Sequence, residues 1–385
     1  MKKLFIVQNH DWAFLAYRKE IAITAKNAGW DVTIVTYNTG RFNDIKSLGL
    51  KAINLPINAT GMNPIEEMRT FSFLYKLYKN EKPDVVHHVG LKTILWGSLA
   101  AKLNKISGVV NAVNGLGVLF SEEKISLTTR GVLLALRFSH NRDNIRVIFQ
   151  NHEDENLFLN QHIVKTENCE YIKGSGINLD EYSYTPEPAS LPIIVIFTAR
   201  MLREKGIVIL TDAAERLRKE YEGKVVFLLC GMLSDNPKAI QEKELRALCD
   251  GKYIQWLGHR TDVKELLCQS HIMAFPSYYR EGVPKSLIEA CAIGRPIVTT
   301  DSVGCRDSVD DGSNGFLVPV KDSVALADKL KVLIDNKSLR EKMGRNSRLK
   351  AEKEFSLSDV VDKHLQIYES LYTETVSKKN ELHNV

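Results

Sequence analysis

Two glutamates, Glu281 and Glu289, are the side chains in this sequence whose type and spacing best suit a chemical role. They follow an apolar run at 271–276 that predicts a buried strand, and Glu289 falls in a predicted helix over 286–293. A turn from a strand into a helix presents free backbone N–H groups and the positive end of the helix dipole to an anion. Glu281 lies in that turn and Glu289 about two helical turns further on. One carboxylate can therefore reach a sugar while the other reaches a ribose.

Two cations, Arg200 and Lys205, follow a second predicted strand over 193–198. Lys205 directly precedes Gly206, where we expect a helix to begin. An arginine fork and a lysine point charge beside a helix N-terminus suit a diphosphate. Taken alone, Arg200 and Lys205 fit solvated surface cations better than a phosphate site. Their position relative to the glutamate pair favours the phosphate site.

Each glutamate also has an ordinary interpretation. Glu289 fits a carboxylate on a helix surface, and Glu281 fits a plain loop acid. Near a nucleotide, Glu289 would accept hydrogen bonds from ribose hydroxyls, as acidic residues do in dinucleotide sites. Glu281 stands beside Gly282, which permits close backbone approach, and would bind hydroxyls of a donor sugar. We favour the functional interpretation for both.

Metal-dependent sugar transfer commonly uses an Asp-x-Asp pair, and this sequence contains none. The cationic pair and the helix dipole would then carry the diphosphate charge in a closed site. We therefore expect no metal and no cofactor other than the donor substrate. The six cysteines form no C-x-x-C pair, which also disfavours a zinc site.

The first half offers a second group of candidates. His87 and His88 end a predicted strand over 84–88, and one of them, His88 by preference, is expected to touch substrate unless both are structural. A glycine-containing loop follows the predicted strand at 108–113, and its glycines allow close approach to a ligand. Together with the pair after the first strand, this loop gives the expected acceptor-binding residues: His10, Asp11, Asn114, Gly115 and Gly117.

These residues need a scaffold of strands that alternate with helices. Such alternation predicts an α/β fold with doubly wound parallel sheets. Prolines at 186, 188 and 192 interrupt the pattern, which then restarts, so we expect two Rossmann-like domains facing a central cleft. The expected parts are a domain at 1–182, a nucleotide-sugar-binding domain at 191–355, a helix at 356–373 that packs on the first domain, and a flexible tail at 374–385.

Bulk properties agree with two soluble domains. The chain has 385 residues, of which 44% are hydrophobic and 26% charged, and this length suits two cores. It has no apolar run of about 18 residues, and its first apolar stretch is shorter than a signal peptide requires. We expect a cytoplasmic protein. The net charge of +5 is compatible with an anionic membrane surface or with phosphorylated substrates.

One segment, 124–146, mixes basic and large apolar residues. A basic helix with an apolar face can lie in a membrane interface. A core helix with a solvated face is an equal alternative. The first interpretation predicts a peripheral protein at the inner face of the cytoplasmic membrane.

As a set, these motifs resemble the retaining glycosyltransferases of family four, which have the GT-B fold. The matching stretches cover most of the second half: Ala199-Arg200 with Lys205-Gly206, Leu257-Gly258-His259, Pro276-Ser277-Tyr278, Glu281 with Glu289, 291–299 and 311–318. In the first half, the stretches 14–18, 114–117 and 174–177 are similar to bacterial enzymes that extend undecaprenyl-diphosphate-linked sugars. Two positions depart from the pattern: Asn9-His10-Asp11-Trp12 replaces glycines common in relatives, and Val89 stands where many carry a histidine.

The resemblance implies a nucleotide-sugar site whose residues match the family motifs: Arg200, Lys205, Gly258, Glu281, Gly282, Val283, Ser286, Leu287 and Glu289. The expected catalytic residues are Glu281, Arg200, Lys205 and His88. The implied reaction moves a sugar, with an N-acetylhexosamine as one candidate, from a UDP-sugar to a polyprenyl-diphosphate-linked saccharide in surface polysaccharide assembly, with retention of configuration.

Two other functions remain compatible with this fold. One is a UDP-sugar epimerase, and the other is a non-catalytic sugar-nucleotide-binding subunit of a polysaccharide assembly complex. The intact set of Arg200, Lys205, Glu281 and Glu289 argues against the second. A nicotinamide dehydrogenase is disfavoured, because no G-x-G-x-x-G follows the first strand of either half.

Overall fold

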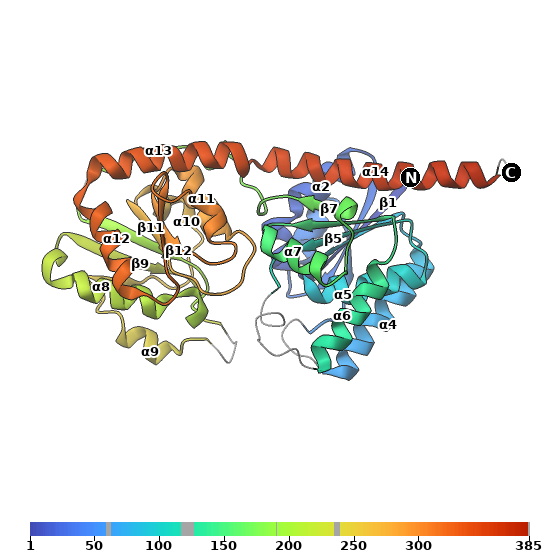
Figure 1. Cartoon of the computed structure of the whole chain (residues 1–385), viewed down its shortest axis with the longest axis horizontal. Helices are drawn as coiled ribbons and strands as arrows, with labels where there is room; N and C mark the ends of the chain where they lie inside the picture. Colours follow the sequence, from blue (N-terminus) through green and yellow to red (C-terminus); the bar gives the residue numbers. More distant parts are fainter. Residues whose placement is uncertain (59–62, 117–126, 190, 235–238, 384–385) are drawn as a thin grey trace. The chain divides into compact units, whose positions relative to one another are not determined.

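The computed structural model divides the chain into two compact units, shown in Figure 1. The first comprises Met1–Ser175 and Ser358–Val385, and the second comprises Gly176–Leu357. The structure describes all residues except 59–62, 117–126, 190, 235–238 and 384–385. The first unit thus ends a little earlier than the position expected from the sequence, and the chain returns to it after completing the second.

The first unit is built on a seven-stranded parallel sheet with the order β3-β2-β1-β4-β5-β6-β7. Its strands are almost wholly buried where both faces are covered by helices, which explains their continuous apolar runs. Their bounds are β1 Lys2–His10, β2 Trp30–Tyr37, β3 Lys51–Asn54, β4 Val85–Val89, β5 Gly108–Val113, β6 Ile145–Phe149 and β7 Cys169–Tyr171.

Helices of the first unit begin and end at recognisable signals. Asn63 caps helix α4 by accepting a hydrogen bond from the N–H of Ile65, and Pro64 occupies the first helical position. Helix α5 is largely buried between neighbours and is apolar on most sides. The bounds are α1 Asp11–Tyr17, α2 Lys19–Asn27, α3 Phe42–Ser47, α4 Pro64–Glu81, α5 Leu91–Leu103, α6 Leu127–His140 and α7 His152–Asn160.

The last helix, α14 (Leu357–His383), packs on the sheet of this first unit. Glu369 accepts hydrogen bonds from the Lys2 ammonium at 2.6 Å and from the Trp30 indole at 2.9 Å. Tyr368 beside it is fully buried. The helix continues beyond Thr373, the end expected from the sequence, to His383.

The second unit has a six-stranded parallel sheet with the order β10-β9-β8-β11-β12-β13. The strands are β8 Ile193–Thr198, β9 Val225–Cys230, β10 Ile254–Trp256, β11 Ile272–Phe275, β12 Ile297–Thr300 and β13 Gly315–Val318. The helices are α8 Ile207–Tyr221, α9 Glu242–Ala247, α10 Val263–Cys268, α11 Lys285–Ile293, α12 Ser323–Asp335 and α13 Lys337–Glu354. One apolar core joins these layers, with Phe197, Phe227 and Phe275 fully or almost fully buried.

Both sheets reverse their winding direction between two neighbouring strands. In the second unit, β8 leads to β9 and β10 on one side, while β11 leads to β12 and β13 on the other. The equivalent pair in the first unit is β1 and β4. Connections leave such a pair in opposite directions, and ligands bind in the crevice that opens beyond its carboxyl ends. The expected doubly wound α/β architecture is therefore confirmed.

Some elements differ from the expectation. Apolar residues continue at helical spacing through 14–28, which favours one helix, but this segment forms two helices broken at Arg18, whose φ of −134° is not helical. Strand β4 also continues one residue beyond His88, to Val89.

Candidate functional site

An ion pair between Lys205 and Glu281 marks the reversal point of the second sheet. Lys205 follows β8 and Glu281 follows β11, the two strands at which the winding reverses. The Lys205 Nζ donates to a carboxylate oxygen of Glu281, and the two side chains are only 13% and 14% exposed. The Ser277 hydroxyl donates to the other Glu281 oxygen at 2.8 Å. The structure thus brings together two residues that were expected to bind the same ligand.

The loop after β8 is held against the loop after β11 by close backbone contact. Gly206, which precedes α8, has a φ of +86°. A Cβ atom at this position would lie 2.0 Å from the carbonyl oxygen of Pro276. The N–H of Tyr278 also donates to the carbonyl oxygen of Glu204 at 2.9 Å. Glycine is needed at 206 both for its backbone conformation and for this approach.

A third loop, after β12, supports the same site. Gly304 has a φ of +84°, and a Cβ atom there would lie 2.3 Å from the carbonyl oxygen of Gly282. The Ser302 hydroxyl donates to the carbonyl oxygen of Ser277 at 3.1 Å, and the Thr300 hydroxyl donates to the same oxygen. The position of Glu281 is therefore fixed by backbone contacts on both sides.

Aromatic rings and a second cation complete the surroundings of Lys205. Its ammonium lies 5.5 Å from the centre of the Phe275 ring and 5.8 Å from that of Tyr279. Burial and the Glu281 carboxylate raise the pKa of Tyr279, whereas Arg200 acts to lower it, so the guanidinium lies in the same neighbourhood. Arg200 is exposed and forms no ion pair within the described part of the chain. One paired and one unpaired cation therefore flank this edge of the sheet.

Helix α11 points its N-terminus into the same region. Its N-cap is Pro284, which provides no side-chain cap, and the N–H groups of Leu287 and Ile288 donate to the Pro284 carbonyl oxygen at 3.0 and 3.2 Å. Gly282, Val283 and Leu287 are buried, while Ser286 is half-buried in the first turn. The positive end of the helix dipole adds to the two cations.

Glu289 lies further along α11 as a partly exposed carboxylate with little support. The Tyr182 hydroxyl donates to it at 3.5 Å, the outer limit of a hydrogen bond. Burial raises the pKa of Glu289 to about 7, against the opposing effects of Lys285 and Tyr182. A carboxylate with unfilled acceptor capacity beside a phosphate-type site is suited to a ligand that carries hydroxyl donors.

Gly258 lies at the same edge, in the loop after β10. Its carbonyl oxygen accepts a hydrogen bond from the N–H of Gly231 at 2.9 Å and so ties the loops after β9 and β10 together. Its φ is +68°. No contact is found between Gly258 and Lys205 or Glu281 among the described residues.

The histidines expected to face a ligand lie instead in the core of the first unit. Both nitrogens of His88 are occupied, by the Tyr78 hydroxyl at 2.9 Å and by Asn111 at 2.8 Å. Its ring fills the space left by Gly97, where a Cβ would lie 2.2 Å away. Burial lowers the pKa of His88 to about 3. The catalytic assignment of His88 is therefore corrected to a structural one, because strand β4 extends beyond it and the side chain has no exposure.

His87, on the opposite face of β4, is also fully buried. Its Nδ1 lies 2.7 Å from the Tyr368 hydroxyl, and its ring packs against His364 of the same helix, α14. Burial lowers its pKa well below the ordinary value, with smaller contributions from His364 and Arg18. His87 is consequently a neutral residue that anchors α14.

Asp11 and His10 follow β1, as expected, but the Asp11 carboxylate is already occupied. It accepts hydrogen bonds from the N–H groups of Trp12, Thr39 and Arg41 at 2.7–3.0 Å, and from the Thr39 hydroxyl. Burial raises its pKa, but these bonds outweigh burial and lower it overall. Asp11 thus fixes the loop after β2. Its expected role in binding the acceptor substrate is therefore corrected to a structural one. His10 is half-buried and stacks on Trp12, with ring centres 5.7 Å apart.

The glycine-containing loop lies at the end of β5. Asn114 is exposed, and Gly115 has a φ of +97°. Gly117 lies outside the described residues. Two residues that contact Asn114, namely Arg18 and Gln150, were not among the expected site residues. Neither were Ser277, Tyr182 or Tyr279, whose side-chain contacts depend on loops that come together only in the folded sheet.

Two family models match the chain. Residues 185–350 match the model described as glycosyl transferases group 1, and residues 3–151 match the model described as glycosyl transferase 4-like. The two matches fall in the two structural units and together include more than half of the chain.

Curated relatives with known names align over most of their length. A Campylobacter jejuni N,N'-diacetylbacillosaminyl-diphospho-undecaprenol alpha-1,3-N-acetylgalactosaminyltransferase is 27% identical, over 92% of this chain and 94% of the relative. An Escherichia coli UDP-Gal:alpha-D-GlcNAc-diphosphoundecaprenol alpha-1,3-galactosyltransferase is 23% identical, over 89% of both chains. The Staphylococcus aureus capsular polysaccharide biosynthesis glycosyltransferase CapM is 25% identical, over 81% and 83%.

Solved structures show the same fold. The Anabaena protein HepE in complex with UDP superimposes with a TM-score of 0.77 at 19% identity, covering 96% of this chain and all of that one. A sucrose-phosphate synthase from Thermosynechococcus elongatus gives a TM-score of 0.78 at 18% identity, covering 97% of this chain and all of the other.

Proposed function

Because the chain belongs to the group 1 glycosyltransferases and has the GT-B fold, we propose that it transfers a hexose-type sugar from UDP to a polyprenyl-diphosphate-linked saccharide, with retention of configuration. Binding of the UDP-sugar donor is supported by one observation: Lys205, Glu281 and the N-terminus of α11 lie together at one edge of the second sheet. The acceptor class follows the names of the two relatives that align over about nine-tenths of the chain.

The donor diphosphate is held by Arg200, Lys205 and the first turn of α11. Arg200 is exposed and has no carboxylate partner in the described residues, so its charge is available to a ligand. Lys205 is held in place by Glu281 and keeps N–H donors for a phosphate oxygen. Glu281 in turn has lone pairs for hydroxyls of the sugar, and Glu289 accepts from the ribose. Gly282 contributes a backbone N–H group in this arrangement.

The reaction proceeds on one face of the sugar. The bond between the anomeric carbon and the departing phosphate oxygen breaks, and a bond from the acceptor hydroxyl oxygen forms on the same side. The acceptor proton passes to the departing phosphate oxygen, so no protein base is required. Arg200, Lys205 and the helix dipole stabilise the charge that develops on the diphosphate. His88 takes no part, since its nitrogens are occupied in the core.

Metal independence belongs to the same proposal. Two cations and a helix N-terminus supply positive charge where a divalent ion would otherwise lie. Transfer should then continue at full rate in excess EDTA. A rate restored only by added magnesium or manganese would contradict this.

A lipid-linked acceptor requires contact with a membrane surface, and we propose helix α6 for this role. Leu134 is 63% exposed and Phe138 52% exposed on this helix. The Lys102 ammonium lies 4.7 Å from the centre of the Phe138 ring, so a cation and an apolar ring are presented together. Among the described residues, every helix is too short or too polar to cross a bilayer.

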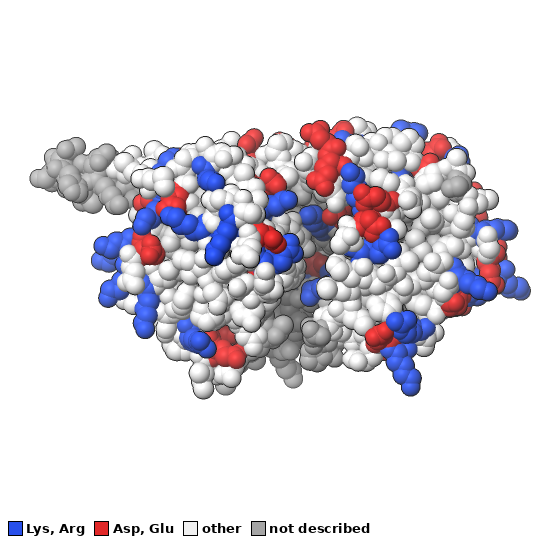
Figure 2. Space-filling view, turned by 180° about the vertical axis from the view of Figure 1, so that it is seen from behind, with Lys and Arg blue, Asp and Glu red and all other residues white. Residues whose placement is uncertain are grey.

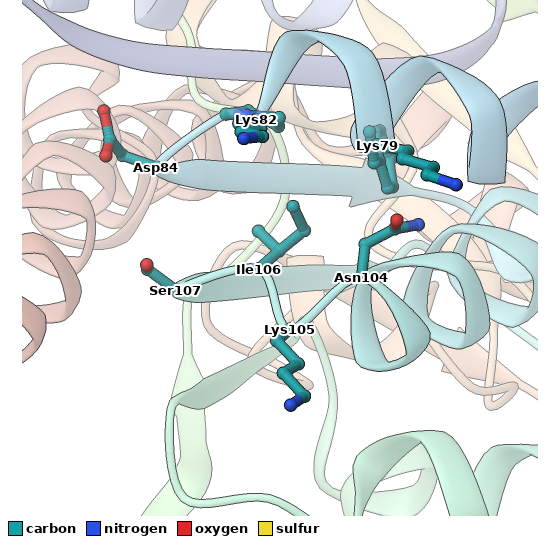
Figure 3. Close-up of a pocket in the computed structure, with 9 residues that line it drawn as sticks. Lys79, Lys82, Asp84, Asn104, Lys105, Ile106 and Ser107 are labelled. Atoms are coloured by element: carbon teal, nitrogen blue, oxygen red, sulfur yellow. The ribbon is translucent and has the colours of Figure 1, made fainter.

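Basic side chains near this helix add a second attraction. Lys79, Lys82 and Lys105 border a hollow of about 290 Å³ at the amino ends of β4 and β5, drawn in Figure 3. All three are exposed and form no ion pair within the described residues. Elsewhere, basic and acidic side chains are interspersed over the face seen in Figure 2. The three lysines would add an attraction to an anionic lipid surface at this edge.

The direct test is transfer from a panel of UDP-sugars to undecaprenyl-diphosphate saccharides, with product anomers assigned by NMR. Calorimetric titration with UDP, GDP and ADP, each in excess EDTA, first identifies the base. Selective UDP binding and an α-linked product from an α-linked donor support the proposal. Donor binding without transfer to any lipid-linked acceptor would overturn the acceptor class, and GDP selectivity would overturn the donor class.

A further inference from the structure

Arg18 is a buried cation without a counter-charge. It lies between α1 and α2 in the first unit and is 2% exposed. Its Nη1 donates to the carbonyl oxygen of Tyr17 at 3.1 Å, and its Nη2 donates to Oδ1 of Asn114 at 3.2 Å. Its Nε has no partner, and Arg18 forms no ion pair, within the residues that the structure describes. Burying a charge in this way costs free energy unless a counter-charge or a full set of hydrogen bonds compensates for the lost hydration.

The groups around Arg18 do not neutralise it. Burial lowers the pKa of Arg18 to about 10. In the described part of the chain, the only nearby groups that could carry a negative charge and stabilise it are the phenols of Tyr368 and Tyr17, which are neutral at pH 7. His87 and His364 are also close enough to be affected by Arg18, and burial lowers the pKa of both, that of His364 to about 3. The Nε2 atoms of both imidazoles lack partners among the described residues. The cluster is therefore positive, and Arg18 has no carboxylate partner among the described residues.

Asn114 connects this buried charge to the surface. A guanidinium can only donate hydrogen bonds, so the Asn114 side chain must turn its oxygen toward Arg18. Gln150, itself buried, donates to the same oxygen from Nε2 at 2.9 Å. Two donors occupy both lone pairs of Oδ1. The Nδ2 group of the exposed Asn114 makes no hydrogen bond within the described residues and is left with two N–H donors.

We propose that Asn114 binds a phosphate oxygen of the lipid-linked acceptor, with Arg18 and Gln150 as positioning residues. Asn114 follows β5 at the carboxyl edge of the first sheet, the edge at which ligands of doubly wound sheets bind. Its amide is fixed as a donor, and the charge of Arg18 behind it strengthens an interaction with an anion. A sugar hydroxyl needs no such charge, which is why we assign phosphate. This inference rests on the proposed function for its choice of ligand.

The first experiment measures binding and does not depend on turnover. Geranyl diphosphate, a soluble prenyl diphosphate, is titrated into the full-length protein in saturating UDP, so that the donor site is filled. We expect binding by the wild type, about ten-fold or more weaker binding by Asn114→Asp, and no detectable binding of geraniol. The substituted carboxylate keeps its contact with Arg18 but loses both donors and repels phosphate. Asn160→Asp, an equal charge change at an exposed position of the same unit, is the matched control.

The role of Arg18 is tested by substitution and rescue. Arg18→Met should weaken geranyl diphosphate as much as Asn114→Asp does, and Arg18→Lys should restore part of the affinity. UDP affinity should be unchanged in all of them, since the nucleotide site lies in the other unit. Because Arg18→Met can impair folding, the exposed Asn114 variants decide the matter if it does. Equal affinity of wild type and Asn114→Asp for geranyl diphosphate would overturn the proposal.

Failure of this inference can be told apart from failure of the proposed function. With active lipid-linked acceptors, Asn114→Asp should raise the KM for acceptor about ten-fold while leaving the KM for UDP-sugar unchanged. A neutral alkyl glycoside of the same saccharide should show no such effect. Normal transfer with an unchanged acceptor KM would refute the Asn114 site alone. Absence of transfer with intact geranyl diphosphate binding would refute the function and leave the site.

Discussion

Lys205 and Glu281 are separated by 76 positions in the sequence, yet they form one ion pair beyond two adjacent strands. The pair is mostly buried, and Glu281 is also held by Ser277. Such a pair orients both side chains before a ligand arrives. It leaves Lys205 with N–H donors for phosphate and Glu281 with lone pairs for hydroxyls.

Removal of Lys205 should therefore affect turnover more than folding. We expect Lys205→Ala to reduce kcat by about 100-fold, because the transition-state charge on the diphosphate loses a donor. Steady-state kinetics with a saturating donor measure this. The double variant with Glu281→Gln removes the carboxylate left unpaired and separates its repulsion from the loss of the cation. Full activity of Lys205→Ala would disprove the phosphate assignment.

The pH dependence of nucleotide binding should report on Glu289. Its pKa is raised to about 7 by burial, so in the free protein it gains a proton as pH falls through neutrality. A protonated carboxyl accepts fewer hydrogen bonds from ribose, and uridine affinity should fall between pH 8 and pH 6. Uridine is preferred to UDP because it carries no phosphate that titrates in this range. Glu289→Gln should bind more weakly at pH 8 and show a flat profile, as calorimetry can determine.

The same shift has a consequence for stability with the opposite trend. The pKa of Glu289 is higher in the folded protein than in the unfolded chain, so the folded state binds this proton more tightly. Ionisation of the buried Glu289 carboxyl destabilises the folded state. This destabilisation is absent below the pKa that Glu289 has in the unfolded chain, and it grows as pH rises to about 7. Relative to Glu289→Gln, the unliganded wild type should lose stability over that window. Chemical denaturation of both proteins at pH 5 and pH 8 tests the difference, and equal differences at the two values would contradict it.

Gly206 offers a test of the backbone contact between two loops. Gly206→Ala places a Cβ against the Pro276 carbonyl and also strains a φ of +86°. Gly223→Ala has a similar φ of +81° but meets nothing within 4 Å, and so controls for backbone strain. We expect about 1 kcal/mol of destabilisation at 223 and at least twice that at 206, with weaker UDP binding only at 206. Denaturant unfolding and UDP titration measure both effects.

Membrane binding should depend on the exposed apolar side chains of α6. Leu134→Ser with Phe138→Ser should abolish most pelleting with anionic vesicles and leave UDP affinity unchanged. Arg137 and Arg142 are poor targets for the same purpose, because they donate to the carbonyl oxygens of Gln161 and Ile106 and support the fold. An exposed apolar pair elsewhere, Val324→Ser with Val332→Ser on α12, is the control. Unchanged pelleting of the α6 variant would exclude this helix as the contact.

The parts of the fold that follow from local pattern were predictable. Strand β8 has the expected bounds, 193–198, because it is a short apolar run between polar turns. The break at Arg18 was not visible, since apolar residues continue with helical spacing on both sides of it. A helix pattern records which positions are buried and carries no signal for a single non-helical φ.

The site was predictable where backbone position decides the role, and less so where partners do. Lys205, Glu281 and Glu289 each follow or enter an element at the carboxyl edge, and strand order then brings the first two together. His88 also looked like an edge residue, but its partners Tyr78 and Asn111 come from a helix and a neighbouring strand. The side-chain partners of a polar residue depend on tertiary packing, which a single sequence does not display.

The return of α14 to the first unit governs the order in which the protein is completed. Tyr368 and Glu369 supply contacts to His87, Lys2 and Trp30, which belong to the earliest segments to leave the ribosome. Until the whole second unit has been synthesised, the sheet that contains those segments lacks the helix that covers it. A fragment that stops near residue 175 would lack that helix permanently. The first unit therefore should be expressed alone only as a permuted chain in which 358–385 is joined ahead of residue 1 by a linker.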